Sequence, residues 1–236
     1  MKRGQSGFSL FELVVAMGIF SIVSVLVFSF FRYGTRAFHQ AAAKHGLQTE
    51  ALRIAESLQK ELKRTNESTV DIVHDSRALS LDGQTVHRDV ICFATLKNWH
   101  DRLNTNNFDL ESRAPLWNRY MVYYATMEPK GRLIKLRVDP APPPEAPTRL
   151  GTTDLSRLYY DNPQANRYAG SMPSYSVLSP NVQDFDIARS SSSPGAFDIS
   201  LKLKQKHPKG SVEPGARREF DFYELQLTVR PENSFP

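Results

Sequence analysis

The chain has 236 residues, of which 40% are hydrophobic, enough for one globular domain and an additional segment. Its formal net charge of +5 is too small and too scattered to indicate nucleic acid or anionic lipid as a partner by itself. The single cysteine, Cys92, excludes an internal disulfide and any metal site that needs several thiolates. Because Cys92 lies in an apolar run, we predict a small buried hydrophobic side chain rather than a reactive thiol.

The first element is an apolar segment at residues 8–31, which carries one charge, Glu12. As a helix, these residues extend about 36 Å, enough to cross an apolar layer of about 30 Å. The apolar region of an ordinary secretory signal peptide has only about 7 to 15 residues. The small-residue run at 41–43, a conceivable cleavage site, lies well past the end of the apolar segment. We therefore predict a membrane-spanning helix, whose orientation the flanking lysines and arginines do not fix.

A short basic leader precedes this segment. Residues 1–7 read MKRGQSG, and residues 8–12 read FSLFE. The arrangement resembles the class III signal of type IV prepilins and type II secretion pseudopilins: glycine before the cut, phenylalanine after it, and glutamate at the fifth mature position. The resemblance implies that a membrane-embedded prepilin peptidase cleaves between Gly7 and Phe8 and methylates the new amino group of Phe8.

Glu12 is the one charged residue inside the apolar segment. A carboxylate within a membrane helix costs about 2.5 to 3.5 kcal/mol on insertion scales, so such a residue is usually paired or functional. Its natural partner is the amine released at Phe8. The spacing of four allows a pair within one helix, whereas the resemblance implies a pair with the Phe8 amine of a neighbouring subunit that sets the axial register. We favour the pair between subunits.

An amphipathic pattern continues the helix over residues 32–65. Apolar residues recur at spacings of three and four, with charged residues on the other side. The apolar stripe consists of Leu47, Ala51, Ile54, Ala55, Leu58 and Leu62. We expect one helix of about 87 Å from Phe8 to about Thr65, with the stripe packed on a sheet.

From residue 66 the apolar period changes to two, which predicts a β-rich domain at residues 66–236. The predicted strands are residues 69–74, 89–95, 119–127, 132–139, 182–188, 196–204 and 220–230. Residues 128–131 and 190–195 are predicted as hairpin loops. The fold class is therefore α+β, with a long N-terminal helix packed on a mostly antiparallel sheet, as in pilin-like proteins.

Three irregular features remain in this domain. The last strand changes its apolar phase between Phe222 and Leu225, which indicates a bulge. The proline-rich residues 139–147 are expected to form an extended loop, because proline lacks the N–H that a strand needs. Residues 149–180 are expected to form a long surface excursion, whose tyrosines either offer a partner surface or pack half-buried.

The layout resembles the minor pseudopilins of type II secretion, most closely the J-type subunit, or the W-type minor pilins of type IV pili. The specific part of this resemblance covers about the first 65 residues. Glu12 argues against the K-type tip subunit, and the length argues against a major subunit. No acidic calcium loop is evident, so we predict no metal and no cofactor.

The resemblance also implies a location and partners. The leader at 1–7 is removed, residues 8–31 span the bacterial inner membrane once, and the C-terminal domain lies in the periplasm. The implied partners are other minor and major pseudopilins or pilins, the prepilin peptidase and the inner-membrane assembly platform.

DNA binding by a competence-type minor pilin would need a cationic groove with aromatic residues. The candidate cations are Lys202, Lys204, Lys206, Lys209, Arg217 and Arg218. A solvated strand face and loop explain them more simply, so we do not expect nucleic-acid binding.

An enzyme is the third alternative. The sequence contains no GxSxG motif and no glycine-rich phosphate loop after a strand. Its histidines, which show no metal-ligand spacing, are His39, His45, His74, His87, His100 and His207. Asp109 and Glu111 are expected to be solvated loop residues. We therefore predict that the chain is not an enzyme.

Overall fold

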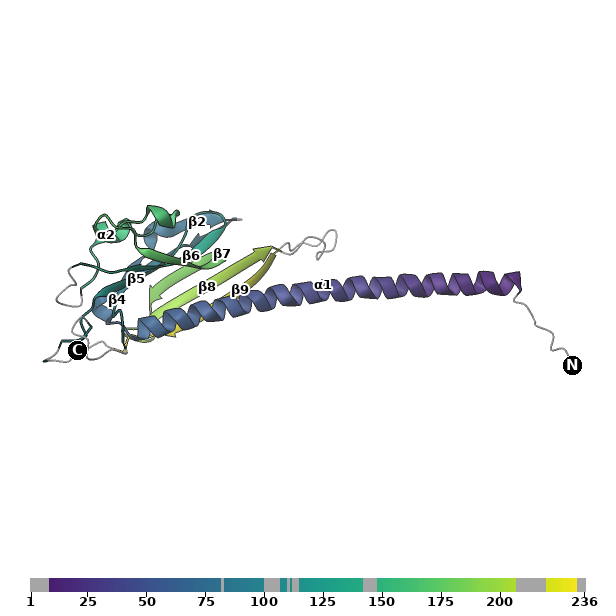
Figure 1. Ribbon diagram of the computed structural model, residues 1–236, viewed down its shortest axis with the longest axis horizontal. Helices are drawn as coiled ribbons and strands as arrows, with labels where there is room; N and C mark the ends of the chain where they lie inside the picture. The colour runs from purple at the N-terminus through teal and green to yellow at the C-terminus, as the bar shows by residue number, and fades with distance from the viewer. Residues whose placement is uncertain are drawn as a thin grey trace.

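The computed structural model describes residues 9–81, 83–99, 107–109, 111, 115–141, 148–206 and 220–232. A single long helix, α1 (Leu10–Lys63), runs along one face of an antiparallel β-sheet and projects far beyond it (Figure 1). This is the α+β, pilin-like architecture that the sequence predicts, so the predicted fold class is confirmed.

Helix α1 starts and ends where local chemistry favours it. Ser9 is the N-cap, and its side chain accepts a hydrogen bond from the backbone N–H of Glu12. Lys60 and Lys63 lie in the last turn, where positive charge interacts favourably with the helix dipole. The helix has 54 residues and is therefore about 81 Å long. It ends two residues before the predicted Thr65.

The outer half of α1 packs on the sheet. Five residues of the predicted stripe are buried, namely Leu47, Ala51, Ile54, Leu58 and Leu62, while Ala55 is half-buried. They join a core cluster with strand residues such as Phe93, Phe185 and Leu201. The part of α1 before Leu47 contains no buried residue. The β-rich domain, called the head below, therefore buries side chains of the helix only from Leu47 onward.

The main sheet has the strand order β1-β4-β5-β6-β7-β8-β9, and every neighbouring pair is antiparallel. The strand bounds are β1 (Asp71–Val73), β4 (Val90–Thr95), β5 (Arg119–Ala125), β6 (Gly131–Val138), β7 (Ser174–Arg189), β8 (Phe197–Lys206) and β9 (Phe220–Val229). The predicted hairpin loops at 128–131 and 190–195 join β5 to β6 and β7 to β8.

A second, two-stranded sheet was not predicted. It consists of β2 (Ala78–Leu81) and β3 (Gln84–His87), which form an antiparallel hairpin. Gly83 in its turn has a φ of 76°, a conformation that glycine adopts without strain. The strands have four residues each, too short for a clear alternation of apolar and polar side chains.

The surface excursion predicted at residues 149–180 is wrong at its C-terminal end, because strand β7 begins at Ser174 and not at the predicted residue 182. Its first residues pair with β6 but are mostly exposed, so they carry no apolar alternation. Pro180 lies between the paired residues Ser179 and Val182, where the register with β6 shifts. Proline fits there because a bulge leaves a residue without a ladder hydrogen bond.

The predicted bulge in the last strand is wrong. Strands β8 and β9 pair without a register shift over the whole of β9. The change of apolar phase arises because Phe220 and Phe222 lie on the sheet face opposite Leu225. There they pack under lysines: Lys204 Nζ lies 4.2 Å from the centroid of the Phe220 ring and 5.8 Å from that of Phe222.

Residues 148–173 cover the sheet face opposite α1. This segment contains α2 (Thr152–Ser156), which lies on the side of the sheet away from α1 (Figure 1). It buries Leu150, Leu155 and Leu158 in a second core cluster that includes Cys92. The segment is thus a cover for the core rather than only a surface excursion. The thiol of Cys92 is buried, as predicted, and burial raises its pKa.

Of the four tyrosines in residues 149–180, two are partly buried and two are exposed, so both predicted arrangements, half-buried packing and an exposed surface, occur. Tyr159 is partly buried and packs under Arg77, whose guanidinium lies 4.9 Å from the ring centroid. Tyr168 is partly buried against the second core cluster. Tyr160 and Tyr175 are exposed. Of the proline-rich stretch, residues 142–147 lie outside the described residues.

A polar clamp fixes α1 to the sheet. Lys135 Nζ on β6 lies 2.5 Å from Glu61 Oε1 on α1, and the hydroxyl of Tyr123 donates to Glu61 Oε2 at 2.7 Å. The Lys135 side chain is 8% exposed and that of Glu61 27%. Burial, and next to it the Glu61 carboxylate, raise the pKa of Tyr123. The clamp therefore depends on a carboxylate at residue 61.

We expect Glu61→Ala to lower the free energy of unfolding by about 3 kcal/mol, because it leaves the buried Lys135 ammonium without its partner. Urea unfolding of the full chain in detergent micelles, followed by circular dichroism, measures this. Glu56→Ala, an exposed change on the same helix, is the control. Adding Lys135→Met to the Glu61 variant should recover much of the loss. Equal stability of the two single alanine variants would contradict the clamp.

Candidate processing and assembly site

The predicted assembly residue, Glu12, lies in the first turn of α1. Its Oε2 accepts hydrogen bonds from the backbone N–H of Ser9 at 3.0 Å and from the Ser9 hydroxyl at 3.1 Å. The Ser9 hydroxyl in turn accepts from the Glu12 N–H at 3.3 Å. These reciprocal bonds form a capping box, which satisfies two donors at the helix start.

Within one protomer, Glu12 thus has a structural role that we did not predict from the sequence. The motif that would have revealed it is Ser9 followed by Glu12, the spacing of a capping box. The predicted cleavage residues Gly7 and Phe8 lie outside the described residues, so both pairs considered for Glu12 and the Phe8 amine stay predictions. The Glu12 side chain is exposed, so a neighbouring subunit has access to it.

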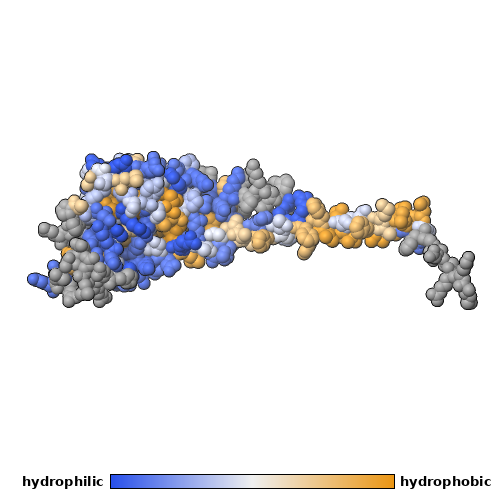
Figure 2. All heavy atoms as spheres, viewed as in Figure 1, coloured by the Kyte–Doolittle hydropathy of each residue, from blue (hydrophilic) through white to orange (hydrophobic). Residues whose placement is uncertain are grey.

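The first part of α1 presents mostly apolar side chains on the face seen in Figure 2. Leu10, Phe20 and Phe30 are 82%, 73% and 77% exposed, and most other large apolar residues up to Phe38 are also exposed. By length and composition, α1 can cross a membrane. A helix that is hydrophobic on most of its surface suits contact with lipid or with other apolar helices, so this segment is compatible with a membrane anchor.

The cations considered for DNA binding are only partly described. Lys202, Lys204 and Lys206 follow one another on the side of β8 that faces away from α1, beside Phe220 and Phe222. Lys209, Arg217 and Arg218 lie outside the described residues. The described lysines pack over aromatic rings of the next strand, an arrangement that an exposed sheet face also explains.

The predicted solvated acids lie apart from the N-terminal site. The Glu111 N–H donates to Asp109 Oδ1 at 3.0 Å, a local turn contact in a loop. Glu111 is exposed and Asp109 partly exposed.

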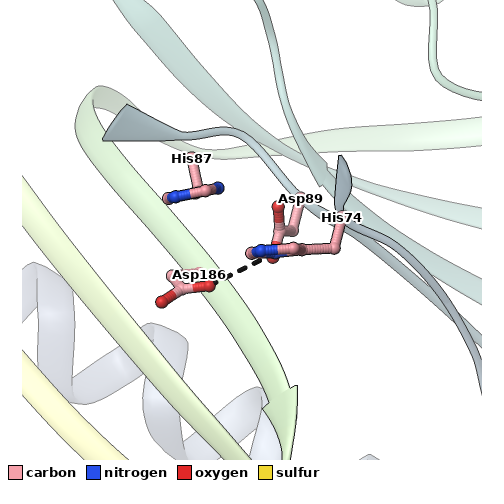
Figure 3. A group of neighbouring side chains, drawn as sticks. All are labelled: His74, His87, Asp89 and Asp186. Carbon is pink, nitrogen blue, oxygen red and sulfur yellow. Dashed lines mark hydrogen bonds and ion pairs between the residues drawn. The ribbon is translucent and has the colours of Figure 1, made fainter. Parts of the chain in front are cut away.

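The histidines are the main feature that sequence reasoning missed. His39 and His45 lie on α1, and His100 and His207 lie outside the described residues. His74 and His87, however, meet in space with Asp89 and Asp186, as Figure 3 shows. Their spacing in the sequence gave no clear signal, because only His87 and Asp89 are neighbours, and the tertiary fold brings His74 and Asp186 to them from distant segments.

Comparison with known families gave one match. Residues 2–28 match the family model of the prokaryotic N-terminal methylation motif. Comparison with curated proteins and with solved structures gave no match. The matched residues include the leader, Gly7, Phe8, Glu12 and much of the apolar part of α1. The chain therefore carries a type IV prepilin-like N-terminus on an α+β fold of pilin-like architecture.

Proposed function

We propose that the chain is a minor pseudopilin of a type II secretion system, which initiates or caps the pseudopilus and helps protein export. One observation carries this proposal: the methylation motif at residues 2–28 leads directly into an apolar helix that projects from the head with no buried residue before Leu47. A helix with such a surface is suited to lipid before assembly and to neighbouring helices afterwards.

The proposal includes processing and location. Prepilin peptidase cleaves between Gly7 and Phe8 and methylates Phe8. Residues 8–31 then hold the protein in the bacterial inner membrane, with the β-rich domain in the periplasm. The partners are other pseudopilins and the inner-membrane assembly platform, and the chain itself does no covalent chemistry.

Glu12 has two successive roles in this proposal. In the isolated protomer its carboxylate caps α1 through Ser9. During assembly it pairs with the Phe8 amine of a neighbouring subunit. The exposure of the Glu12 side chain supports this exchange, because the carboxylate is reached without any rearrangement of the head.

The same motif and helix also suit a minor pilin of a type IV or competence pilus, so the test must separate the two systems. The gene is deleted in its host, and both the exported proteins in the medium and the surface fibres are measured. Loss of export with intact fibres supports the pseudopilin. Loss of fibres with intact export indicates the minor pilin instead. If neither changes, and the chain does not co-purify with other subunits, it is not a fibre component.

A further inference from the structure

Four side chains of the types that ligate metals meet beside β7: His74, His87, Asp89 and Asp186 (Figure 3). One potential ligand atom from each lies within 4.8 Å of those of the others. We propose that these four residues bind one divalent transition-metal ion of the zinc class.

Strand geometry places two of the ligands together. Residues 87–89 run beside β7, where Arg88 forms a parallel bridge with Phe185 and the Asp89 N–H donates to the Phe185 carbonyl at 2.9 Å. In an extended chain, alternate side chains point to opposite sides. His87 and Asp89 therefore share one side, and Arg88 points to the other.

His74 reaches the same place from the end of β1. Its Nδ1 lies 2.7 Å from Asp89 Oδ2 and 3.4 Å from Asp186 Oδ1. Its ring stacks on His87, with centroids 4.4 Å apart and planes 8° apart. The lone pair of an imidazole lies in the ring plane, so the lone pairs of two parallel stacked rings do not point to one common position. A shared ion therefore requires one of the two rings to turn. The partial exposure of His74 permits this rotation.

Buried ligand atoms without hydrogen bonds support the site independently. The Asp89 side chain is 0% exposed, and its Oδ1 has no hydrogen-bond partner among the described residues. Within the same part of the chain, His87 Nδ1 is also buried without a hydrogen bond. Asp186 Oδ1 is buried as well and makes the 3.4 Å ion-pair contact with His74. The Ile187 N–H donates to Asp89 Oδ2 at 2.7 Å and holds that carboxylate in place. Unsatisfied buried polar atoms cost free energy, and a bound metal ion would lower that cost.

The ligand set selects the class of ion. Two imidazole nitrogens and two carboxylate oxygens suit zinc and related transition metals, whereas calcium and magnesium prefer oxygen alone. With neutral imidazoles, the two carboxylates are balanced by one divalent cation. A proton on His74 supplies half of that charge and leaves His87 Nδ1 and Asp89 Oδ1 without partners.

The neighbouring arginines do not occupy the site. Arg77 donates to the backbone carbonyls of Arg88 and Ala125, and Arg88 donates to the carbonyl of Val182. Arg88 thus points away from the four proposed ligands, and the Arg77 guanidinium is held by two backbone carbonyls.

A bound metal ion would connect the two sheets. His74 directly follows β1, His87 ends β3, Asp89 directly precedes β4, and Asp186 lies near the C-terminal end of β7. A bound ion thus ties the β2–β3 hairpin to the main sheet. The ion should stabilise the folded domain, because it binds the folded chain and not the unfolded one.

The test uses the full chain without a polyhistidine tag, purified in detergent micelles and stripped with EDTA. Calorimetric titration with zinc chloride should show one equivalent bound, and zinc should raise the melting temperature. His87→Gln and Asp186→Asn should each weaken binding roughly tenfold or more, since even outer-shell changes cost about 10- to 100-fold. His39→Gln, an exposed histidine on α1, is the matched control and should bind as the wild type does.

Wild-type zinc affinity in both ligand variants overturns the proposal, as does the absence of saturable binding. Calcium binding in place of zinc overturns the class of ion. If the variants do not fold, cobalt(II) added to the wild-type chain gives a second reading. Strong visible absorption of a four-coordinate site supports the proposal, and a spectrum like that of the hydrated ion contradicts it.

Discussion

Glu12→Gln is expected to prevent incorporation of the chain into fibres as completely as Glu12→Ala, with the protein retained in the membrane. Glutamine can replace glutamate in a capping box, so the start of α1 is preserved. It cannot, however, neutralise the Phe8 amine of a neighbouring subunit. Removing one partner of a buried ion pair costs about 3 to 5 kcal/mol, which corresponds to a loss of on the order of 100-fold or more in incorporation.

Crosslinking and co-purification with other subunits measure incorporation, and immunoblotting of the membrane fraction measures retention of the protein. Ser9→Ala is the matched control, because it removes the capping hydroxyl and leaves the carboxylate; it costs about 1 kcal/mol of helix stability and should assemble nearly normally. Normal assembly of Glu12→Gln would show that Glu12 acts only as a cap. Loss of either Glu12 variant from the membrane would mean that the anchor itself has failed.

Gly7→Val is expected to leave the chain as an uncleaved precursor. The proposed cleavage follows this glycine, and valine places a branched side chain at the bond that would be cut. Without cleavage no amine forms at Phe8, so Glu12 loses its proposed partner and assembly stops as well. Intact-mass measurement of the purified protein distinguishes the precursor from a mature chain that starts at methylated Phe8.

Gly4→Val is the control for this experiment, because it changes the other glycine of the leader and not the cleaved bond. It should give the same mature mass as the wild type. A wild-type chain that begins after residue 43 would indicate ordinary signal cleavage. A wild-type chain that keeps residues 1–7 in a cell with active prepilin peptidase would rule out the proposed processing.

The sequence predicted the long-range layout well, because its signals are local and long. The apolar run and the stripe from Leu47 to Leu62 extend over many helical turns, so α1 was predicted to within a few residues at both ends. Regular alternation in residues 197–204 likewise located β8. The family match confirms the nature of the N-terminal motif, while cleavage at Gly7 and pairing of Glu12 stay predictions.

What the sequence did not predict depends on contacts between distant segments. The start of β7 is exposed and pairs only through its backbone, so its side chains carry no strand pattern. The phase change at Phe222 indicated a bulge, but it arises because Phe222 lies on the sheet face opposite Leu225, where it packs beside Lys204 of the neighbouring strand β8. His87 and Asp186 are 99 residues apart, and their meeting requires β7 to lie beside the β2–β3 hairpin.

The attachment of α1 to the head determines how the protein bears mechanical load. Within the described residues, the buried stripe from Leu47 to Leu62 and the Glu61–Lys135 pair hold the helix on the sheet. A thrust along the helix axis strains all of these contacts in shear at the same time, so they share it. A sideways pull on the exposed half acts as a lever and peels the helix from Leu47 onward, one contact after another. The protein is therefore built to resist axial force far better than bending.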